Sequence, residues 1–233
     1  MSAARSSDMT MSEDEARMQR RSFLMGLAAC GGALSIGSHA RRARADEVGD
    51  ALAEITRARA SVKTLVAPFT QERSIGLLAT AVKSDGEMTL VLPDRLRWEL
   101  KPPDAITYWI TPEGFGFATP KGAAGAGRGA AGRFGAVLSD LLVLLGGDLG
   151  KLRARYDLSI PSRADGITLA ARPRAEEVAK HVRSLEMTSG PELWSVRRVV
   201  IEERNGDRSV IAFGKVARDV SVDPARMKAP KQG

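Results

Sequence analysis

Residues 87–110 read EMTLVLPDRLRWELKPPDAITYWI, and this stretch decides the fold class. Apolar and polar side chains alternate over 87–92, 96–100 and 106–110, whereas prolines stand at the breaks between these segments and shortly after the third. A period of two is typical of strands with one buried face, and closely spaced turn residues join antiparallel neighbours. The stretch therefore predicts three strands of an antiparallel sheet.

The rest of the chain extends this sheet. Further alternating segments predict strands at 155–160, 167–172, 182–188, 196–204 and 208–215, and a last short one at 219–223. Asn205-Gly206 favours the left-handed dihedral angles of a two-residue hairpin turn. We expect an α+β, mainly β protein: a single curved antiparallel sheet of eight or more strands, with helices on one side.

Two helices and one loop complete the expected architecture. Residues 48–65 carry apolar side chains at spacings of three and four, which predicts an amphipathic helix. Residues 134–145 are apolar around almost the whole circumference, so this helix must be covered on several sides; it is either core or the cover of a hydrophobic ligand. Residues 176–180 predict a short helical turn, and the Gly- and Ala-rich segment 121–135 predicts a flexible loop.

Composition excludes several classes of function. The chain has 233 residues, 43% of them hydrophobic and 27% charged, which suits one globular domain. Its net charge of +7 comes partly from the first 45 residues and forms no basic stripe, so we expect no nucleic-acid partner. One Cys and two His make a metal site improbable. The pattern G-x-G-x-x-G at 127–132 follows no clear strand, so we expect no cofactor.

The N-terminus predicts an export signal. Arg20-Arg21 precedes Phe23-Leu24 and an apolar run that ends at Ile36, as in twin-arginine signal peptides. Ala43-Arg44-Ala45 has the small side chains that a signal peptidase requires, so cleavage after Ala45 would leave residues 46–233 as the mature domain. The alternative is a lipobox at 27–30, which would leave a lipid-modified Cys30 as a membrane anchor.

The order of these segments resembles the periplasmic outer-membrane lipoprotein carriers, the LolA-like proteins. The resemblance covers residues 48–227 and rests on Phe69-Thr70-Gln71, Gly86-Glu87, the segment 93–98 (PDRLRW), Glu113-Gly114 and the hairpin at 205–207. It implies an open half-barrel with helices across its concave side and a hydrophobic cavity between them. Such carriers take acylated lipoproteins from an inner-membrane exporter, shield their acyl chains and deliver them to an outer-membrane acceptor. We expect such a carrier to work in the periplasm as a monomer, without a cofactor or an enzymatic activity.

Strand alternation nominates the residues that would line the cavity, although ordinary core packing is the competing explanation for each of them. The candidates are apolar or aromatic side chains of the strands and of the mid-chain helix: Phe69, Met88, Leu90, Leu92, Leu96, Trp98, Leu100, Ile106, Tyr108, Ile110, Phe115, Phe117, Leu138, Leu141, Leu142 and Leu145.

One position departs from the family. Many of these carriers have an Arg directly before the proline of the turn after the second strand, where it holds a helical lid closed; this chain has Leu92 before Pro93. This departure concerns the lid and the exporter that the chain can use. Because a fold of this kind does not fix its cargo, a lipid-sensing module on the same scaffold is an open alternative, as is an extracellular interaction protein. A hydrolase would depend on His181, the one histidine of the mature domain, and we expect that residue on the surface.

Overall fold

The computed structural model describes residues 33–76, 81–126, 132–146 and 148–230. The chain divides into two compact units, Met1–Ala45 and Asp46–Gly233. Helix α2 (Ala33–Arg59) has residues in both units. The leader motifs at Arg20-Arg21 and Cys30 lie outside the described residues. The second unit contains every described strand.

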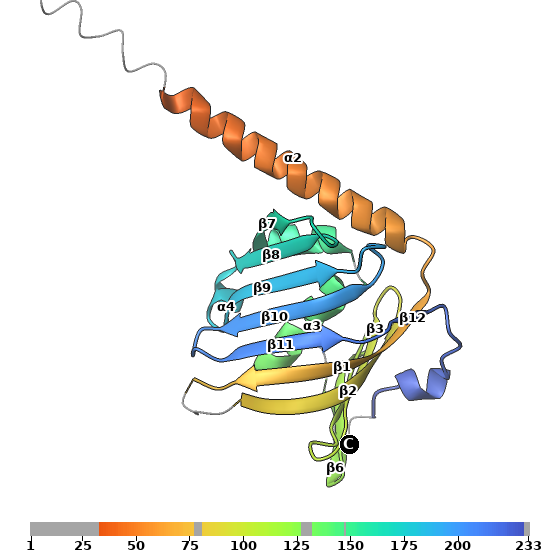
Figure 1. Cartoon of the computed structure of the whole chain (residues 1–233). Helices are drawn as coiled ribbons and strands as arrows, with labels where there is room; N and C mark the ends of the chain where they lie inside the picture. The colour runs from red at the N-terminus through yellow and green to blue at the C-terminus, as the bar shows by residue number, and fades with distance from the viewer. Residues whose placement is uncertain (1–32, 77–80, 127–131, 147, 231–233) are drawn as a thin grey trace, which may run out of the picture. The chain divides into compact units, whose positions relative to one another are not determined.

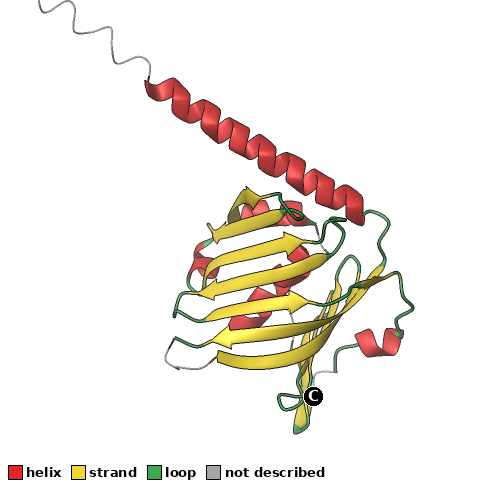
Figure 2. Ribbon diagram, viewed as in Figure 1, coloured by secondary structure: helices red, strands yellow, loops and turns green. Residues whose placement is uncertain are grey.

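The second unit is built on one large antiparallel sheet (Figure 1, Figure 2). Its neighbour order is β6-β5-β4-β3-β2-β1-β11-β10-β9-β8-β7, with β12 also paired to β1. The described strands are β1 (Thr64–Ser74), β2 (Ala81–Val91), β3 (Arg95–Leu100), β4 (Thr107–Thr111), β5 (Gly114–Thr119), β6 (Gly122–Ala126), β7 (Tyr156–Ser162), β8 (Thr168–Pro173), β9 (Val182–Ser189), β10 (Val196–Glu203), β11 (Arg208–Phe213) and β12 (Ala217–Arg218). The α+β class and the single open antiparallel sheet are confirmed.

The sheet bends between its two halves. Strands β7 to β11 form a broad surface, and β1 and β2 curve away from it toward β3 to β6, which are seen nearly edge-on (Figure 2). Helix α3 (Gly132–Leu145) lies across the back of the broad half in this view (Figure 1). The C-terminal end of α3 also reaches β2, because a Cβ atom at Gly146 would lie 2.4 Å from the Cδ2 atoms of Leu90 and Leu92. The helix therefore touches both halves and lies inside the bend.

Three shorter helices complete the unit. The 3-10 helix η1 (Leu149–Ala154) follows α3, α4 (Glu176–Ala179) joins β8 to β9, and η2 (Pro224–Met227) lies in the C-terminal tail. The expected turn at 176–180 and the mid-chain helix are thus confirmed. The hairpin at Asn205-Gly206 is confirmed, but its turn is longer than the expected two residues, because the Glu203 backbone N–H donates to the Asp207 carbonyl oxygen. Gly206 has a φ of 90°, a value that residues with a side chain rarely adopt.

The prediction of an amphipathic helix over 48–65 is wrong at the C-terminal end of that range. Helix α2 ends at Arg59, and Leu65 belongs to β1, where it pairs with Leu90. Val62, Thr64 and Val66 have β-branched side chains that favour strands, and pairing with β2 outweighs the helical spacing.

Two further expectations are corrected. Part of the predicted flexible loop forms β6, which pairs with β5, because backbone hydrogen bonds need no side chain; residues 127–131 lie outside the described part. The strand predicted at 219–223 is absent, and the strand nearby is Ala217–Arg218. Asp219 has a φ of 56°, outside the extended region, and its carboxylate accepts a hydrogen bond from the Lys63 backbone N–H.

Candidate functional site

The candidate side chains of β1 to β5 share one face of the sheet. Strand pairing aligns Ala67, Met88, Trp98, Tyr108 and Phe117 in one row across five strands. A second row, two residues along each strand, consists of Leu65, Leu90, Leu96, Ile110 and Phe115. Residues that pair across strands point to the same side of a sheet, as do residues two apart on one strand. The strand candidates therefore form one continuous apolar surface.

An aromatic cluster closes the β1 end of this surface. The rings of Phe69 and Trp98 stack with their centroids 3.9 Å apart, and Phe213 of β11 packs edge-on against both. The stacking needs Gly86, which pairs with Phe69, because a Cβ atom there would lie 2.1 Å from Phe69 Cζ. Offset or edge-on aromatic contacts add to the free energy gained from burial alone. This end of the surface is therefore tightly packed core.

Burial decreases along the rows toward β5. Met88, Leu90, Leu96 and Trp98 are at most 2% exposed. Tyr108 and Phe115 are half-buried and stack on each other with centroids 6.0 Å apart. Phe117 is 37% exposed, although it points to the same face as the buried members of its row. The apolar surface thus runs from the core into solvent at the β4–β5 end.

Helix α3 covers the buried part of the surface. Leu141, Leu142 and Leu145 are at most 9% exposed and belong to the same core cluster as the strand residues. Leu92, just after β2, is half-buried and lies close to Gly146. Leu138 belongs to α3, but its side chain lies outside the described part of the chain.

Two further candidates flank the loop between β3 and β4. The Leu100 backbone N–H donates to the Ile106 carbonyl oxygen at 2.8 Å, and both side chains are half-buried. Leu100 packs against the core cluster. The structure therefore brings the described candidates onto one helix-covered face, and within that face their burial varies from complete to partial.

A buried polar cluster, which was not expected from the sequence, fixes α3. Asp140 of α3 accepts hydrogen bonds from the Tyr156 hydroxyl and the Arg155 guanidinium. Burial raises the pKa of Asp140, although Tyr156 and Arg155 act in the opposite direction. Burial also raises the pKa of Tyr156, and its hydrogen bond to Asp140 adds to this effect. A single acid in an otherwise apolar helix was the sequence signal for such an anchor, since a buried carboxylate requires partners.

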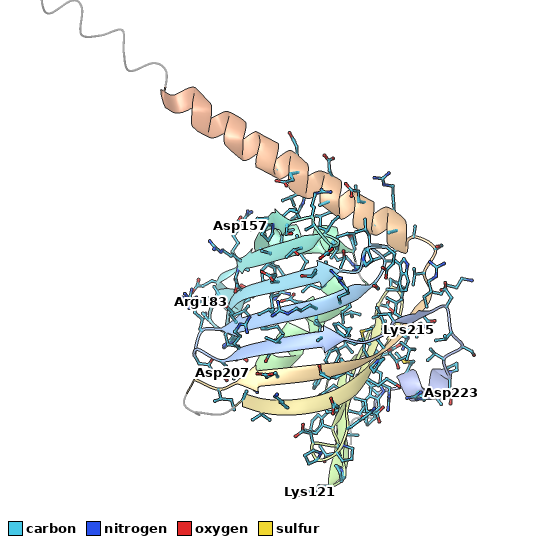
Figure 3. The ribbon with its side chains drawn as sticks, viewed as in Figure 1. Lys121, Asp157, Arg183, Asp207, Lys215 and Asp223 are labelled. Carbon is cyan, nitrogen blue, oxygen red and sulfur yellow. The ribbon has the colours of Figure 1, made fainter. Side chains whose placement is uncertain are left out.

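Charged side chains occupy the opposite face and the margins. Figure 3 labels six of them, which lie in turns and along strands at the periphery: Lys121, Asp157, Arg183, Asp207, Lys215 and Asp223. On the opposite face, Arg226 of η2 pairs with Glu87 of β2, and Trp109 donates its indole N–H to the Arg226 carbonyl oxygen. Apolar and charged residues are thus segregated to different faces of the β2–β4 region.

Other kinds of site are not built by the described residues. No group of three or more His, Cys, Asp or Glu among them is placed to hold a metal ion. His181 is exposed, as expected, and its carbonyl oxygen accepts from the Arg204 backbone N–H. Within the same residues, no helix combines the length and the apolar character that a membrane span requires.

The fold and its helix-covered apolar face define an open antiparallel half-barrel. Over 190 residues, which are 78% of this chain and 80% of the relative, the sequence is 26% identical to an outer-membrane lipoprotein carrier protein of Alkalilimnicola ehrlichii. The resemblance expected from the sequence is confirmed, because this chain is similar to a lipoprotein carrier over most of the length of both proteins. No protein-family model matches it.

Solved structures with a related shape are more distant. A DUF1329 family protein from Desulfovibrio piger is 11% identical, with a TM-score of 0.48 over 78% of this chain and 97% of the other. A LolA superfamily protein from Nitrosomonas europaea is 7% identical, with a TM-score of 0.45 over 77% and 96%. The Pseudomonas aeruginosa MucA/MucB complex includes a chain that is 15% identical, with a TM-score of 0.46 over 79% and 61%. At these scores the three structures add no argument about function.

Proposed function

We propose that the protein is a periplasmic carrier that binds the acyl chains of lipoproteins on its concave apolar face and moves them from the inner to the outer membrane. The single observation that supports this best is the apolar surface that continues from the core to the exposed ring of Phe117. An apolar surface that continues from the core into solvent is typical of a site that receives an apolar ligand.

The energetics of the cargo explain this design. Burying each CH2 group is worth ~0.8 kcal/mol, so a 16-carbon chain costs on the order of 12 kcal/mol to keep in water. A carrier must offset most of this cost and still release the chain. A half-buried face of Leu, Met and aromatic side chains suits that task, because such side chains repack easily around an irregular ligand.

The relative supports the same proposal, since it is named an outer-membrane lipoprotein carrier. In this proposal the leader directs export by the twin-arginine route, cleavage follows Ala45, and the mature protein is a monomer in the periplasm. Its partners are acylated lipoproteins, an inner-membrane exporter and an outer-membrane acceptor. The proposed cycle consists of binding and release alone and includes no catalytic step.

A charge at the exposed end of the apolar face tests the proposal. The Phe117→Glu variant should capture at least about 10-fold less acylated lipoprotein from inner-membrane vesicles that contain the exporter, because a carboxylate must be desolvated where the acyl chain lies. Val220→Glu is the matched control, since Val220 is also 37% exposed but lies in the C-terminal tail. Equal capture by Phe117→Glu and Val220→Glu, at the wild-type level, would refute the proposal.

One observation favours a second candidate, a lipid-binding or lipid-sensing module on the same scaffold. Leu92 stands where many carriers have the lid arginine, and it lies against the end of α3 close to Gly146. An apolar contact at this position would hold the helix without an arginine. Two kinds of vesicle separate the two functions. A sensor would extract a free lipid from vesicles without lipoprotein, and it would leave lipoproteins in the membrane of vesicles that contain them.

A further inference from the structure

Arg59 has a buried guanidinium group that donates to no oxygen atom of the described residues. It is 6% exposed and lies in the last turn of α2. Neither Nε nor Nη1 has a hydrogen-bond partner, and Nη2 contacts the sulfur atom of Met187 at 3.9 Å. No carboxylate of the described residues forms an ion pair with it. A buried charge is normally paired, so this one requires an explanation.

The surroundings of Arg59 belong to the interior of the half-barrel. Met187 of β9 is fully buried and pairs with Leu169 and Val199, which are also fully buried. The charged atoms of Arg59 therefore reach the apolar side of the sheet, although most arginines keep them in water. Burial lowers the pKa of Arg59 to about 10, so the side chain remains cationic at neutral pH.

Packing of α2 forces this orientation. Val48, Ala51, Leu52 and Ile55 precede Arg59 at helical spacing and are all buried, so Arg59 continues the inward stripe of the helix. Arg57, two residues earlier, is exposed, and its Nε donates back to the Ala53 carbonyl oxygen. The helix therefore carries one arginine in water and one in the core, within the same turn.

An acidic residue of the same helix already has an ion-pair partner. Glu54 of α2 pairs with Arg163 in the loop between β7 and β8, where both side chains are 37% exposed. The carbonyl groups at the end of α2 favour a positive charge through the helix dipole, but they form no hydrogen bond with Nε or Nη1. Nε and Nη1, which lie on different edges of the guanidinium plane, thus both remain open, and each can donate a charge-assisted hydrogen bond to a carboxylate or phosphate oxygen.

We propose that Arg59 binds the oxyanion head, a carboxylate or a phosphate, of an amphiphilic ligand whose chain lies on the concave face. This inference rests on the proposed function for the apolar chain and adds a charge requirement to it. A neutral apolar molecule would leave Nε and Nη1 without acceptors, whereas an acid would supply a negatively charged oxygen to one of them. The protein should therefore prefer anionic lipids to neutral lipids of equal chain length.

Binding of matched lipids to the purified, delipidated protein tests the preference. The probes are oleate, methyl oleate, oleoyl lysophosphatidate and inorganic phosphate, each titrated by calorimetry. Oleate or lysophosphatidate should bind at least about 10-fold more tightly than methyl oleate, as expected for a charge-assisted hydrogen bond. Arg59→Met should remove this difference and leave methyl oleate binding intact, whereas the matched control Arg57→Met should leave the difference unchanged.

Each outcome decides a separate point. Equal affinity of the wild type for oleate, lysophosphatidate and methyl oleate would overturn the charge requirement and leave the acyl-chain function standing. Failure of all three lipids to bind would contradict the proposed function itself. Phosphate binding as tight as that of lysophosphatidate would show a free-anion site and overturn the lipid assignment. The wild-type comparison is decisive even if Arg59→Met does not fold.

Discussion

Gly86 tests how the aromatic cluster holds β1, β2 and β3 together. A Cβ atom at this position would lie 2.1 Å from Phe69 Cζ and 2.3 Å from the Glu99 carbonyl oxygen. The first contact displaces the ring that stacks on Trp98, and the second pushes against the backbone of β3. Gly86→Ala should therefore overpack the sheet at the centre of the buried face.

The size of the effect follows from these contacts. Overpacking costs ~1–3 kcal/mol, and losing the ring stacking adds ~0.5–1.5 kcal/mol. Replacing glycine with alanine gains back ~0.5–1 kcal/mol of backbone entropy. We expect the free energy of unfolding to fall by about 2 kcal/mol, and the melting temperature by about 4–8 °C for a domain of this size.

Thermal and urea unfolding, followed by circular dichroism, measure both quantities. Gly49→Ala is the matched control because it makes the same chemical change inside α2, where the nearest atom, Arg153 Nη2, would be 3.5 Å away. The control should be stabilised by up to ~1 kcal/mol. A Gly86→Ala protein that is as stable as the wild type would refute the packing argument.

Two further predictions concern the charged groups. Asp140→Asn should lower the free energy of unfolding by about 2 kcal/mol, because it removes the charge-assisted acceptor of Tyr156 and Arg155, and calorimetry at neutral pH checks this. Since burial raises the pKa of Asp140, its contribution to stability decreases as the pH rises from 3.8 through the folded-state value; an identical pH slope in Asp140→Asn would contradict this. The stability contributed by Glu113 has the opposite pH dependence. Its hydrogen bonds with Arg95 lower its pKa to about 2, so the stability that it adds above pH 4.5 is lost as the pH falls toward 2. For Glu113→Gln, the free energy of unfolding should change less between these pH values. A change as large as in the wild type would show that the Arg95–Glu113 pair does not contribute to stability.

The strands were predictable because their signals are local. Period-two alternation and proline turns located β3 and β4 to within a residue, and Asn205-Gly206 located the last hairpin. The end of α2 was not predictable in this way, because Val62 and Leu65 fit the helical spacing as well as they fit a strand. Only pairing of Leu65 with Leu90 decides between the two structures. Edge strand β6 was missed because its Gly and Ala side chains carry no alternation.

The candidate face was predictable in part. Alternation identified the side chains of each strand, but the sequence does not give the register that joins Met88, Trp98, Tyr108 and Phe117 into one row. It also does not give the order of burial along that row, which depends on where α3 lies. Arg59 fitted the apolar stripe of its helix by spacing, and only its burial without an acceptor distinguishes it from an ordinary surface arginine.

The most direct test of the central claim is native mass spectrometry of the protein purified from the periplasm without detergent. We expect a polypeptide that begins at Asp46 and carries a bound acylated lipoprotein, which the Phe117→Glu variant should lose. A protein that emerges without any acylated species, from cells that make abundant lipoproteins, would contradict it.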